Sequence, residues 1–354
     1  MTRQWADNFD KCHAMKKNRF HFSTGVTDCY FNNSFHQLAK LTPPPRTVIV
    51  TDQQVFKLHR KLFIGWNTIV LKSGEKYKVQ ATVDALIDQL ISLKADRSTT
   101  LVGVGGGVIT DLVGYTASVY MRGIRFGFVP TTLLAMVDAS IGGKNGVDVG
   151  LYKNLAGTIR QPSFLLYDIS FLSTLPLGEW QNGFAEIIKH AAILDAPLFA
   201  ALENKELSYY QKSRVALCAL IKRNALLKIR VVQQDETEKG IRKWLNFGHT
   251  LGHALENQYE LSHGQAISLG MMSAAVLSAH YLQFSASDRI EALLARYGLP
   301  TRAHYNLKKA IKVLAMDKKK SAGIINYVLL KKIGKAVIHP LRIDQLEKKL
   351  ATQL

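Results

Sequence analysis

The sequence predicts two domains: an α/β domain with a mostly parallel sheet over residues 1–168 and a mainly α-helical domain over residues 169–354. Apolar strand-like runs alternate with helix-like segments from Thr47 onward, and that order builds parallel sheets. Three consecutive glycines stand between one of these strands and the helix after it. From about Phe171 the pattern turns helical, and a chain of 354 residues can bury two cores.

The elements of the first domain follow from short apolar runs. Residues 1–46 are expected to be irregular, ending at Pro43-Pro44-Pro45. Buried strands are predicted at 47–52, 66–71, 99–104 and 126–129. Helices are predicted over 54–62 and from the segment 74–78 to about Lys94.

The glycine run Gly105-Gly106-Gly107 suggests a phosphate-binding turn. Glycines between a strand and a helix let the backbone approach a pyrophosphate, whose charge the helix N-terminus favours. The run departs from the G-x-G-x-x-G pattern, so a plain tight turn is the alternative.

A second glycine-rich region carries many polar side chains. Such a set can bind phosphate and carboxylate together, whereas lysines in loops are usually only solvated. The residues concerned are Arg122, Asp138, Lys144, Lys153 and Asn154.

The second domain is predicted to begin with a helix over 177–194. Glu186 and Lys189 stand three apart there, usually the mark of an exposed ion pair, but Glu186 is also a candidate metal ligand. Later elements are a long helix over about 207–233, a connection over 235–242, a helix near 306–315, a hairpin over 324–338 turning at Gly334, and a final amphipathic helix.

The segment 245–256 predicts a metal site. His249 and His253 stand four apart, so a helix presents both imidazoles on one face. His263 could add a third nitrogen, and such donors suit zinc. Histidines at this spacing are more often surface or hydrogen-bonded core residues, so a further ligand must come from elsewhere in the chain.

The formal net charge of +19 has three possible explanations: nucleic-acid binding, attraction of a small polyanionic substrate, or a solvated basic surface. The lysines form no long block, and no interleaved aromatic residues mark a base-stacking surface. Nucleic acid is therefore the disfavoured partner.

The three cysteines, Cys12, Cys29 and Cys218, are scattered and form no C-x-x-C pair, which favours a reducing compartment. The first residues lack the apolar core of a signal peptide. The uncharged run 266–287 contains five serines and fits a buried helix better than a membrane span. We expect a cytoplasmic protein without a membrane partner.

The motifs, taken in order, resemble the 3-dehydroquinate synthases of the shikimate pathway. The resemblance covers nearly everything from Thr47 to Ile338, and no single motif decides it. The matching segments are the triple glycine with Asp111, Arg122-Gly123, 130–135, Val137-Asp138, 142–144, Lys153-Asn154, Leu175-Pro176, Ala185-Glu186, Leu245-Asn246, Gly248-His249, Gly252-His253, His263-Gly264 and 317–319.

The resemblance implies an NAD-binding domain and a helical domain that holds zinc, for which cobalt is a plausible substitute. The metal ligands would be Glu186, His249 and His263, leaving His253 as an acid/base or phosphate-region group. The family's reaction converts a seven-carbon keto sugar acid phosphate, 3-deoxy-D-arabino-heptulosonate 7-phosphate, to 3-dehydroquinate. It proceeds by transient oxidation by NAD, phosphate elimination, reduction, ring opening and aldol closure.

Further site residues are carried over by motif. The catalytic set beside His253 is Lys144, Asn246, Arg242, Lys228, Asp138 and Glu238, and the substrate-binding set is Arg122, Lys153, Asn154, Lys189, Lys318 and Lys319. The NAD-contacting set is Asp52, Glu75, Lys78, Gly105, Gly106, Gly107, Val108, Asp111, Thr131, Thr132, Phe171, Thr174 and Leu175. The family habit also implies a homodimer.

Two positions depart from the family pattern. Gln265 stands where a glutamate usually follows the third ligand, which removes a charge near the metal, and Gln54 replaces a frequent asparagine. The alternatives are a sister sugar-phosphate cyclase and a metal-dependent alcohol or glycerol dehydrogenase. Sister cyclases alter Lys228, Arg242, Asn246 or His253, and the dehydrogenases lack Gly143-Lys144 and the 317–319 motif.

Overall fold

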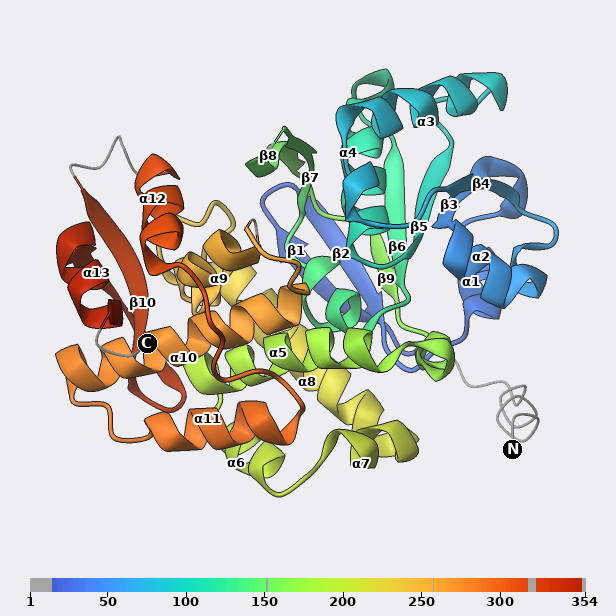
Figure 1. Ribbon diagram of the computed structural model, residues 1–354. Coiled ribbons are helices and arrows are strands. Elements are labelled where there is room, and N and C mark those ends of the chain that lie inside the picture. Colours follow the sequence, from blue (N-terminus) through green and yellow to red (C-terminus); the bar gives the residue numbers. More distant parts are fainter. Residues whose placement is uncertain (1–14, 151, 257, 318–322, 352–354) are drawn as a thin grey trace.

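A computed structural model describes residues 15–150, 152–256, 258–317 and 323–351 (Figure 1). The first half forms a seven-stranded sheet in the order β1-β2-β9-β6-β5-β3-β4. All neighbours are parallel except the antiparallel pair β1–β2, which confirms the predicted mostly parallel sheet. The strands are β1 (Asn18–Phe22), β2 (Gly25–Tyr30), β3 (Thr47–Asp52), β4 (Asn67–Leu71), β5 (Thr100–Gly105), β6 (Arg125–Pro130) and β9 (Phe164–Leu166).

Residues 15–46 correct one expectation, because they are not irregular. β1 and β2 form a hairpin, and β2 then pairs with β9 near the other end of the domain sequence. The Thr27 hydroxyl donates to the Pro162 carbonyl, which joins positions 135 residues apart. Short helical turns follow at η1 (Phe35–Gln37), α1 (Leu38–Leu41) and η2 (Pro44–Arg46). Such short strands gain their stability from a distant partner, so local pattern alone does not reveal them.

Both faces of the sheet are covered, so its inner strands β3, β5 and β6 are apolar on both sides. Val48 and Val50 pack in the core that contains Leu86 of α3 (Gln80–Ser92) and Leu112 of α4 (Gly107–Val119). Ile49 points to the opposite face, in the core of Phe35, Phe63 and Phe171. The predicted helix 54–62 is α2 (Gln53–His59), which continues as the 3-10 turn η3 (Arg60–Phe63).

The second half is helical, as predicted, and Figure 1 shows it packed beside the sheet domain. Its elements are α5 (Leu177–Leu194), α6 (Ala196–Glu203), α7 (Leu207–Lys212), α8 (Arg214–Gln234), η8 (Ile241–Asn246), α9 (His249–Glu256), α10 (His263–Leu282), α11 (Ser287–Arg296), α12 (Leu307–Asp317), the hairpin β10 (Ile324–Lys332) and β11 (Lys335–Arg342), and α13 (Ile343–Ala351).

The structure divides one predicted helix into two and confirms another as a buried helix. The single helix expected over 207–233 is two helices, because Ser213 breaks the run and its side chain accepts a hydrogen bond from the Ala216 amide to cap α8. The uncharged run 266–287 lies mostly in α10, most of whose apolar residues are buried. Among the described helices, none is long and apolar enough to cross a membrane.

Besides β9, four shorter elements of the described chain fall in the middle of the sequence, between residues 135 and 174. The π-turn η6 (Ala135–Ala139) and the 3-10 turn η7 (Ile169–Thr174) flank a hairpin of β7 (Lys144–Val149) and β8 (Tyr152–Ile159). The lysines Lys144 and Lys153, expected in loops, therefore stand on strands. Figure 1 draws this hairpin beside α9, and the Lys153 ammonium lies 2.7 Å from the Glu256 carboxylate of that helix.

The backbones of α9 and α10 touch each other at glycines. A Cβ on Gly270 would lie 1.8 Å from the Gly248 carbonyl oxygen and 3.0 Å from the Gly252 nitrogen. This contact fixes the start of α9, which carries His249, against α10, which begins with His263. Only residues without side chains permit so close an approach.

We therefore expect Gly270→Ala to lower the free energy of unfolding by about 1–3 kcal/mol, because the added methyl group must separate the two helices. Urea unfolding measures the change. Gly178→Ala in α5 is the matched control, since nothing lies within 4 Å of a Cβ there, and it should leave stability equal or slightly higher. Equal stability for both variants would contradict the close contact.

Candidate metal and substrate site

Glu186 is a carboxylate buried at the centre of the helical domain. It lies on α5, where nearly every residue from Asn182 to Ile193 is buried, and its own side chain is inaccessible to solvent. Lys189, one turn later, forms an ion pair with it and is equally buried. The exposed ion-pair face typical of this spacing is thus absent here. A buried charged pair of this kind points to a functional site more than to stability.

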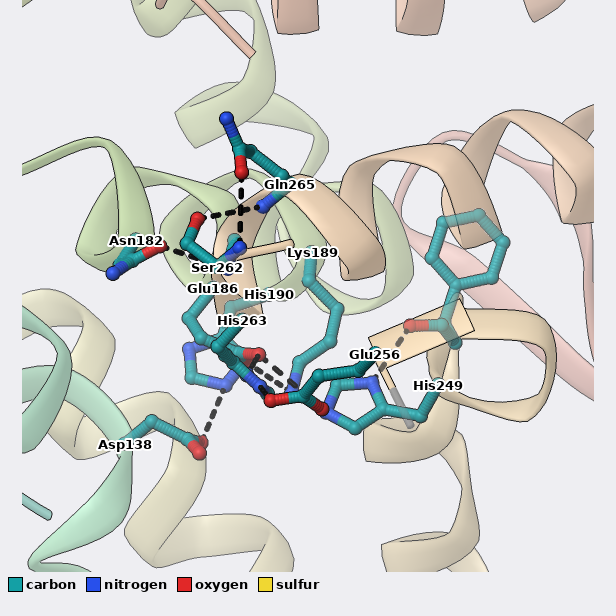
Figure 2. A network of polar contacts seen from close by, with 12 residues as sticks. Asp138, Asn182, Glu186, Lys189, His190, His249, Glu256, Ser262, His263 and Gln265 are labelled. Carbon is teal, nitrogen blue, oxygen red and sulfur yellow. Dashed lines mark hydrogen bonds and ion pairs between the residues drawn. The ribbon is translucent and has the colours of Figure 1, made fainter. Parts of the chain in front are cut away.

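Two histidines from other helices face Glu186 (Figure 2). Nε2 of His263 lies 3.1 Å from its Oε1, and Nε2 of His249 lies 3.5 Å from the same oxygen. One ligand atom from each of the three residues lies within 4.8 Å of the others. Nδ1–H of His249 donates to the Phe247 carbonyl at 3.2 Å, which leaves Nε2 free to bind a cation. One carboxylate and two imidazoles fit a zinc ion.

His253 stays outside this group. Its ring is 5.0 Å from that of His249, so both imidazoles do lie on one face of α9, but the His253 side chain is exposed. Among the described residues, no metal-competent cluster includes it. Spacing alone favours His253 as the partner of His249, whereas the group that the fold brings together is Glu186, His249 and His263, as the family resemblance implies.

The charges of the group suit a divalent cation. Burial would raise the pKa of Glu186, but the Lys189 ammonium and other neighbours hold it below its usual range. Burial lowers the pKa of His249 well below its usual range. Burial would also lower the pKa of His263, yet its interactions with the Glu186 and Glu256 carboxylates raise it to about 9. The site thus offers an ionised carboxylate and at least one neutral imidazole, the forms that bind metal.

Asp138 forms a second buried cluster beside Glu186. The Lys228 ammonium lies 2.7 Å from its carboxylate and also donates to its backbone carbonyl, and Nε2 of the buried His190 lies 3.3 Å away. Burial would raise the pKa of Asp138, but Lys228 holds it well below its usual range. Asp138, Glu186 and His190 could also hold a cation by geometry. The Lys228 ammonium already neutralises the Asp138 carboxylate, and this group offers one imidazole where the first offers two, so the first group suits zinc better.

Residues from both halves meet next to this cluster. Lys144 of β7 forms an ion pair with Glu238, and the Asn246 amide donates to the same carboxylate at 2.6 Å. Arg242 is buried and donates to the carbonyls of Gly142 and Glu236. Gly142 has a φ of +105°, and a Cβ there would lie 2.7 Å from the guanidinium, so the glycine is needed for this approach.

The NAD-contacting candidates lie at the carboxyl ends of the parallel strands. Gly105 ends β5, Gly107 begins α4, and Thr131 and Thr132 follow β6. Ligands of open α/β sheets bind at this edge. Asp52 ends β3 beside a pocket of about 430 Å³ lined by Gln53, Gln54, Lys57, Lys72, Ser73, Lys76 and Tyr77.

Lys78 links several of these candidates. Its ammonium lies 2.5 Å from Asp111 and 3.9 Å from Glu75, and it donates to Asn154 of β8 at 2.5 Å. Burial raises the pKa of Asp111 to about 6 despite this neighbour. Of the candidates in η7, Phe171 is buried against Phe35, and the Thr174 hydroxyl lies 3.0 Å from the His59 ring.

Of the predicted site residues, one is exposed away from the glycine turn and two lie outside the described residues. Arg122 is exposed in η5 (Tyr120–Arg122), beyond the C-terminal end of α4. The 13-residue α4 separates it from the glycine turn by about 20 Å at 1.5 Å per residue. Lys318 and Lys319 lie outside the described residues.

Sequence reasoning missed two residues of the cluster. His190 follows Lys189 on α5, and only burial around the whole of that helix distinguishes it from a surface histidine. Glu256 follows His249 by seven positions, two helical turns, so it returns to nearly the same face of α9. Figure 2 shows both converging on the group around Glu186.

Comparison with known proteins identifies relatives over most of the chain. The sequence model described as 3-dehydroquinate synthase N-terminal matches residues 68–182, and that described as 3-dehydroquinate synthase C-terminal matches residues 183–320. The 3-dehydroquinate synthase of Campylobacter curvus (strain 525.92) is 39% identical over 322 residues, covering 87% of this chain and 91% of the relative. That of Picosynechococcus sp. (strain ATCC 27264 / PCC 7002 / PR-6) is 41% identical over 297 residues, covering 81% and 80%.

A solved structure shares the whole architecture. It is ValA, the 2-epi-5-epi-valiolone synthase from Streptomyces hygroscopicus subsp. jinggangensis 5008, with NAD+ and Zn2+ bound. The TM-score is 0.84 at 28% sequence identity, over 97% of this chain and 98% of that one. The fold is therefore that of a sugar-phosphate cyclase with a mostly parallel sheet domain and a helical domain.

Proposed function

The chain belongs to the 3-dehydroquinate synthase family, and from that premise we propose how its own residues carry out the family's reaction. It is a carbocycle-forming phosphate lyase of the shikimate pathway that converts 3-deoxy-D-arabino-heptulosonate 7-phosphate to 3-dehydroquinate and phosphate. The observation that carries the assignment is the Glu186–His249–His263 group placed beside buried cations and Asp138. The proposed metal ligands thus lie next to cationic side chains, which suits a substrate that carries hydroxyls together with a carboxylate and a phosphate.

NAD and zinc are the cofactors, with cobalt as a substitute. Glu186, His249 and His263 would hold the metal, which acts when bound as a Lewis acid on the substrate hydroxyls. Residues of the Gly105-Gly106-Gly107 turn, at the carboxyl edge of the sheet, would hold NAD, which would supply reversible hydride transfer when bound.

The remaining residues bind and orient the substrate. Lys144, Arg242 and Lys228 supply positive charge from three separate elements, and the substrate carries both a carboxylate and a phosphate. Glu238 holds the Lys144 ammonium and the Asn246 amide in fixed positions, so both can be aimed at one ligand. His253, whose ring lies 5.0 Å from that of His249, is the proposed acid/base group. Lys153, Asn154 and Lys189 complete the proposed binding set.

The identities at four positions favour this reaction over that of a sister cyclase. Lys228, Arg242, Asn246 and His253 are the residues of the dehydroquinate type. The alcohol and glycerol dehydrogenases lack the Gly143-Lys144 motif that this chain has. Nucleic-acid binding is disfavoured because several cations, among them Lys189, Lys228 and Arg242, are buried in the site. Steep, salt-sensitive affinity for DNA would contradict this.

Three further proposals concern organisation. We place the domain boundary at residues 168/169, because β9 ends at Leu166 and the helical run begins with α5 at Leu177. We propose a homodimer, which light scattering tests. We propose a cytoplasmic enzyme, since Cys29 and Cys218 are both free thiols.

The test of function is incubation of the purified protein with the seven-carbon substrate, zinc and catalytic NAD. We expect phosphate and the cyclic product in equal amounts, many turnovers per NAD, and no accumulation of NADH, because the hydride is returned. NADH rising in step with product would indicate a dehydrogenase instead.

A further inference from the structure

We propose that Glu256, at the end of α9, is the carboxylate that orients the His263 imidazole for metal binding, and that Lys153 of β8 anchors it. The inference rests on the proposed metal site. It assigns to Glu256 the role that Gln265 cannot fill.

The two ring nitrogens of His263 have different partners. Nε2 points to Glu186, the other proposed ligand, at 3.1 Å. Nδ1 points the other way, and Oε1 of Glu256 lies 3.8 Å from it. That separation is an ion-pair distance, longer than a hydrogen bond, and a small side-chain rotation would close it. Histidine ligands usually donate their second N–H to a carboxylate or carbonyl, which fixes the ring and makes the ligating nitrogen more basic.

Gln265 cannot serve in this way because its side chain is used elsewhere. Ser262 caps α10, and Oε1 of Gln265 accepts a hydrogen bond from the Ser262 amide at 2.9 Å in a capping box. The side chain is thereby turned to the helix start rather than to the His263 ring. In Figure 2, Gln265 lies on the opposite side of Ser262 from the ligand group.

Glu256 is held in place by a second contact. Lys153 lies 2.7 Å from the same Oε1, and the Glu256 side chain is only 11% exposed. Its other oxygen, Oε2, is buried without a hydrogen-bond partner among the described residues. A buried carboxylate with an unused oxygen retains capacity to accept the Nδ1–H of His263.

Local helix energetics give no reason for a glutamate here. Glu256 is the last residue of α9, where the negative end of the helix dipole disfavours a carboxylate. A plain surface ion pair with Lys153 would contribute little, and it would not require burial. The contact with His263 supplies the missing reason for an acidic residue at this position.

Measurement of metal affinity tests the proposal without using turnover. We expect Glu256→Gln to weaken zinc or cobalt binding about 10- to 100-fold in competition with a chelator. The visible absorption of the cobalt form should also change, because the His263 ring is no longer fixed. Glu260→Gln, an exposed glutamate on the same connection, is the matched control and should match the unchanged protein in both measurements.

The outcomes separate cleanly. Glu256→Asp keeps the charge, so its metal affinity should lie between that of Glu256→Gln and that of the unchanged protein. If circular dichroism shows that Glu256→Gln does not fold, Glu256→Asp takes its place in the test. A metal Kd within twofold of the unchanged protein, with an unaltered cobalt spectrum, would overturn the role of Glu256. Failure of the unchanged protein to bind either metal would instead overturn the metal site itself, and this inference with it.

Discussion

Replacing Glu186, His249 or His263 by alanine should strip the enzyme of metal and lower kcat by roughly three orders of magnitude or more. Each residue supplies one of the three ligand atoms that meet within 4.8 Å. Two remaining ligands leave a weak site, and the Lewis acid they held is worth several kcal/mol at about 1.4 kcal/mol per factor of ten. Metal analysis of the purified variants, beside steady-state kinetics, measures both effects.

His253→Ala provides the internal control for this series. Its ring stands beside His249 but outside the ligand group, so the variant should keep its metal. Loss of an acid/base group should still lower kcat by about 10²- to 10⁴-fold. Metal depletion in His253→Ala as severe as in His249→Ala would show that the ligands are wrongly assigned.

Lys144→Met should lower kcat/KM by about two orders of magnitude or more. The Lys144 side chain is 54% exposed and Glu238 holds its ammonium, so the ammonium is accessible to an anionic ligand. An ordinary exposed lysine would contribute under about 1 kcal/mol. A charge-assisted contact within an occupied site contributes several times that amount. Kinetics with the seven-carbon substrate give the value, and zinc and NAD binding should be nearly unchanged.

Lys332→Met is the comparison for this variant. Lys332 is exposed at the end of β10, in a hairpin that carries none of the proposed site residues. Its removal lowers the net charge by the same amount and should change kcat/KM little. Similar values of kcat/KM for the two variants would show that Lys144 is a solvated lysine without a part in substrate binding.

The alternation of apolar runs was sufficient to predict the parallel core of the sheet. β3, β5 and β6 are continuous buried strands, and each carries its own signal of β-branched and aromatic residues. β1 and β2 carry weaker signals because they are short and depend on β9 for their position. Lys144 and Lys153 were read as loop residues because glycine and polar residues hide the strand pattern of β7 and β8.

The metal group shows a different limit of sequence reasoning. Spacing identifies residues on one face of a helix, and it correctly put His249 beside His253. It does not say which other helix that face meets. The contact of α9 with α10 and α5 replaces His253 by His263 and Glu186, and only the motif order of the family implied that outcome. His190 and Glu256 could not be predicted as part of the cluster because spacing does not show which helices their side chains face.

The pairing of β2 with β9 constrains the order in which the nascent chain can fold. The bond between Thr27 and Pro162 spans 135 positions, so the ribosome must synthesise most of the first domain before β2 can join its neighbour. At about 5–20 residues per second, the N-terminal hairpin waits roughly 7–27 seconds with an unpaired strand edge. The earliest strands to be translated are thus among the last to enter the sheet, and until then the edge of β2 is open to pairing with other chains.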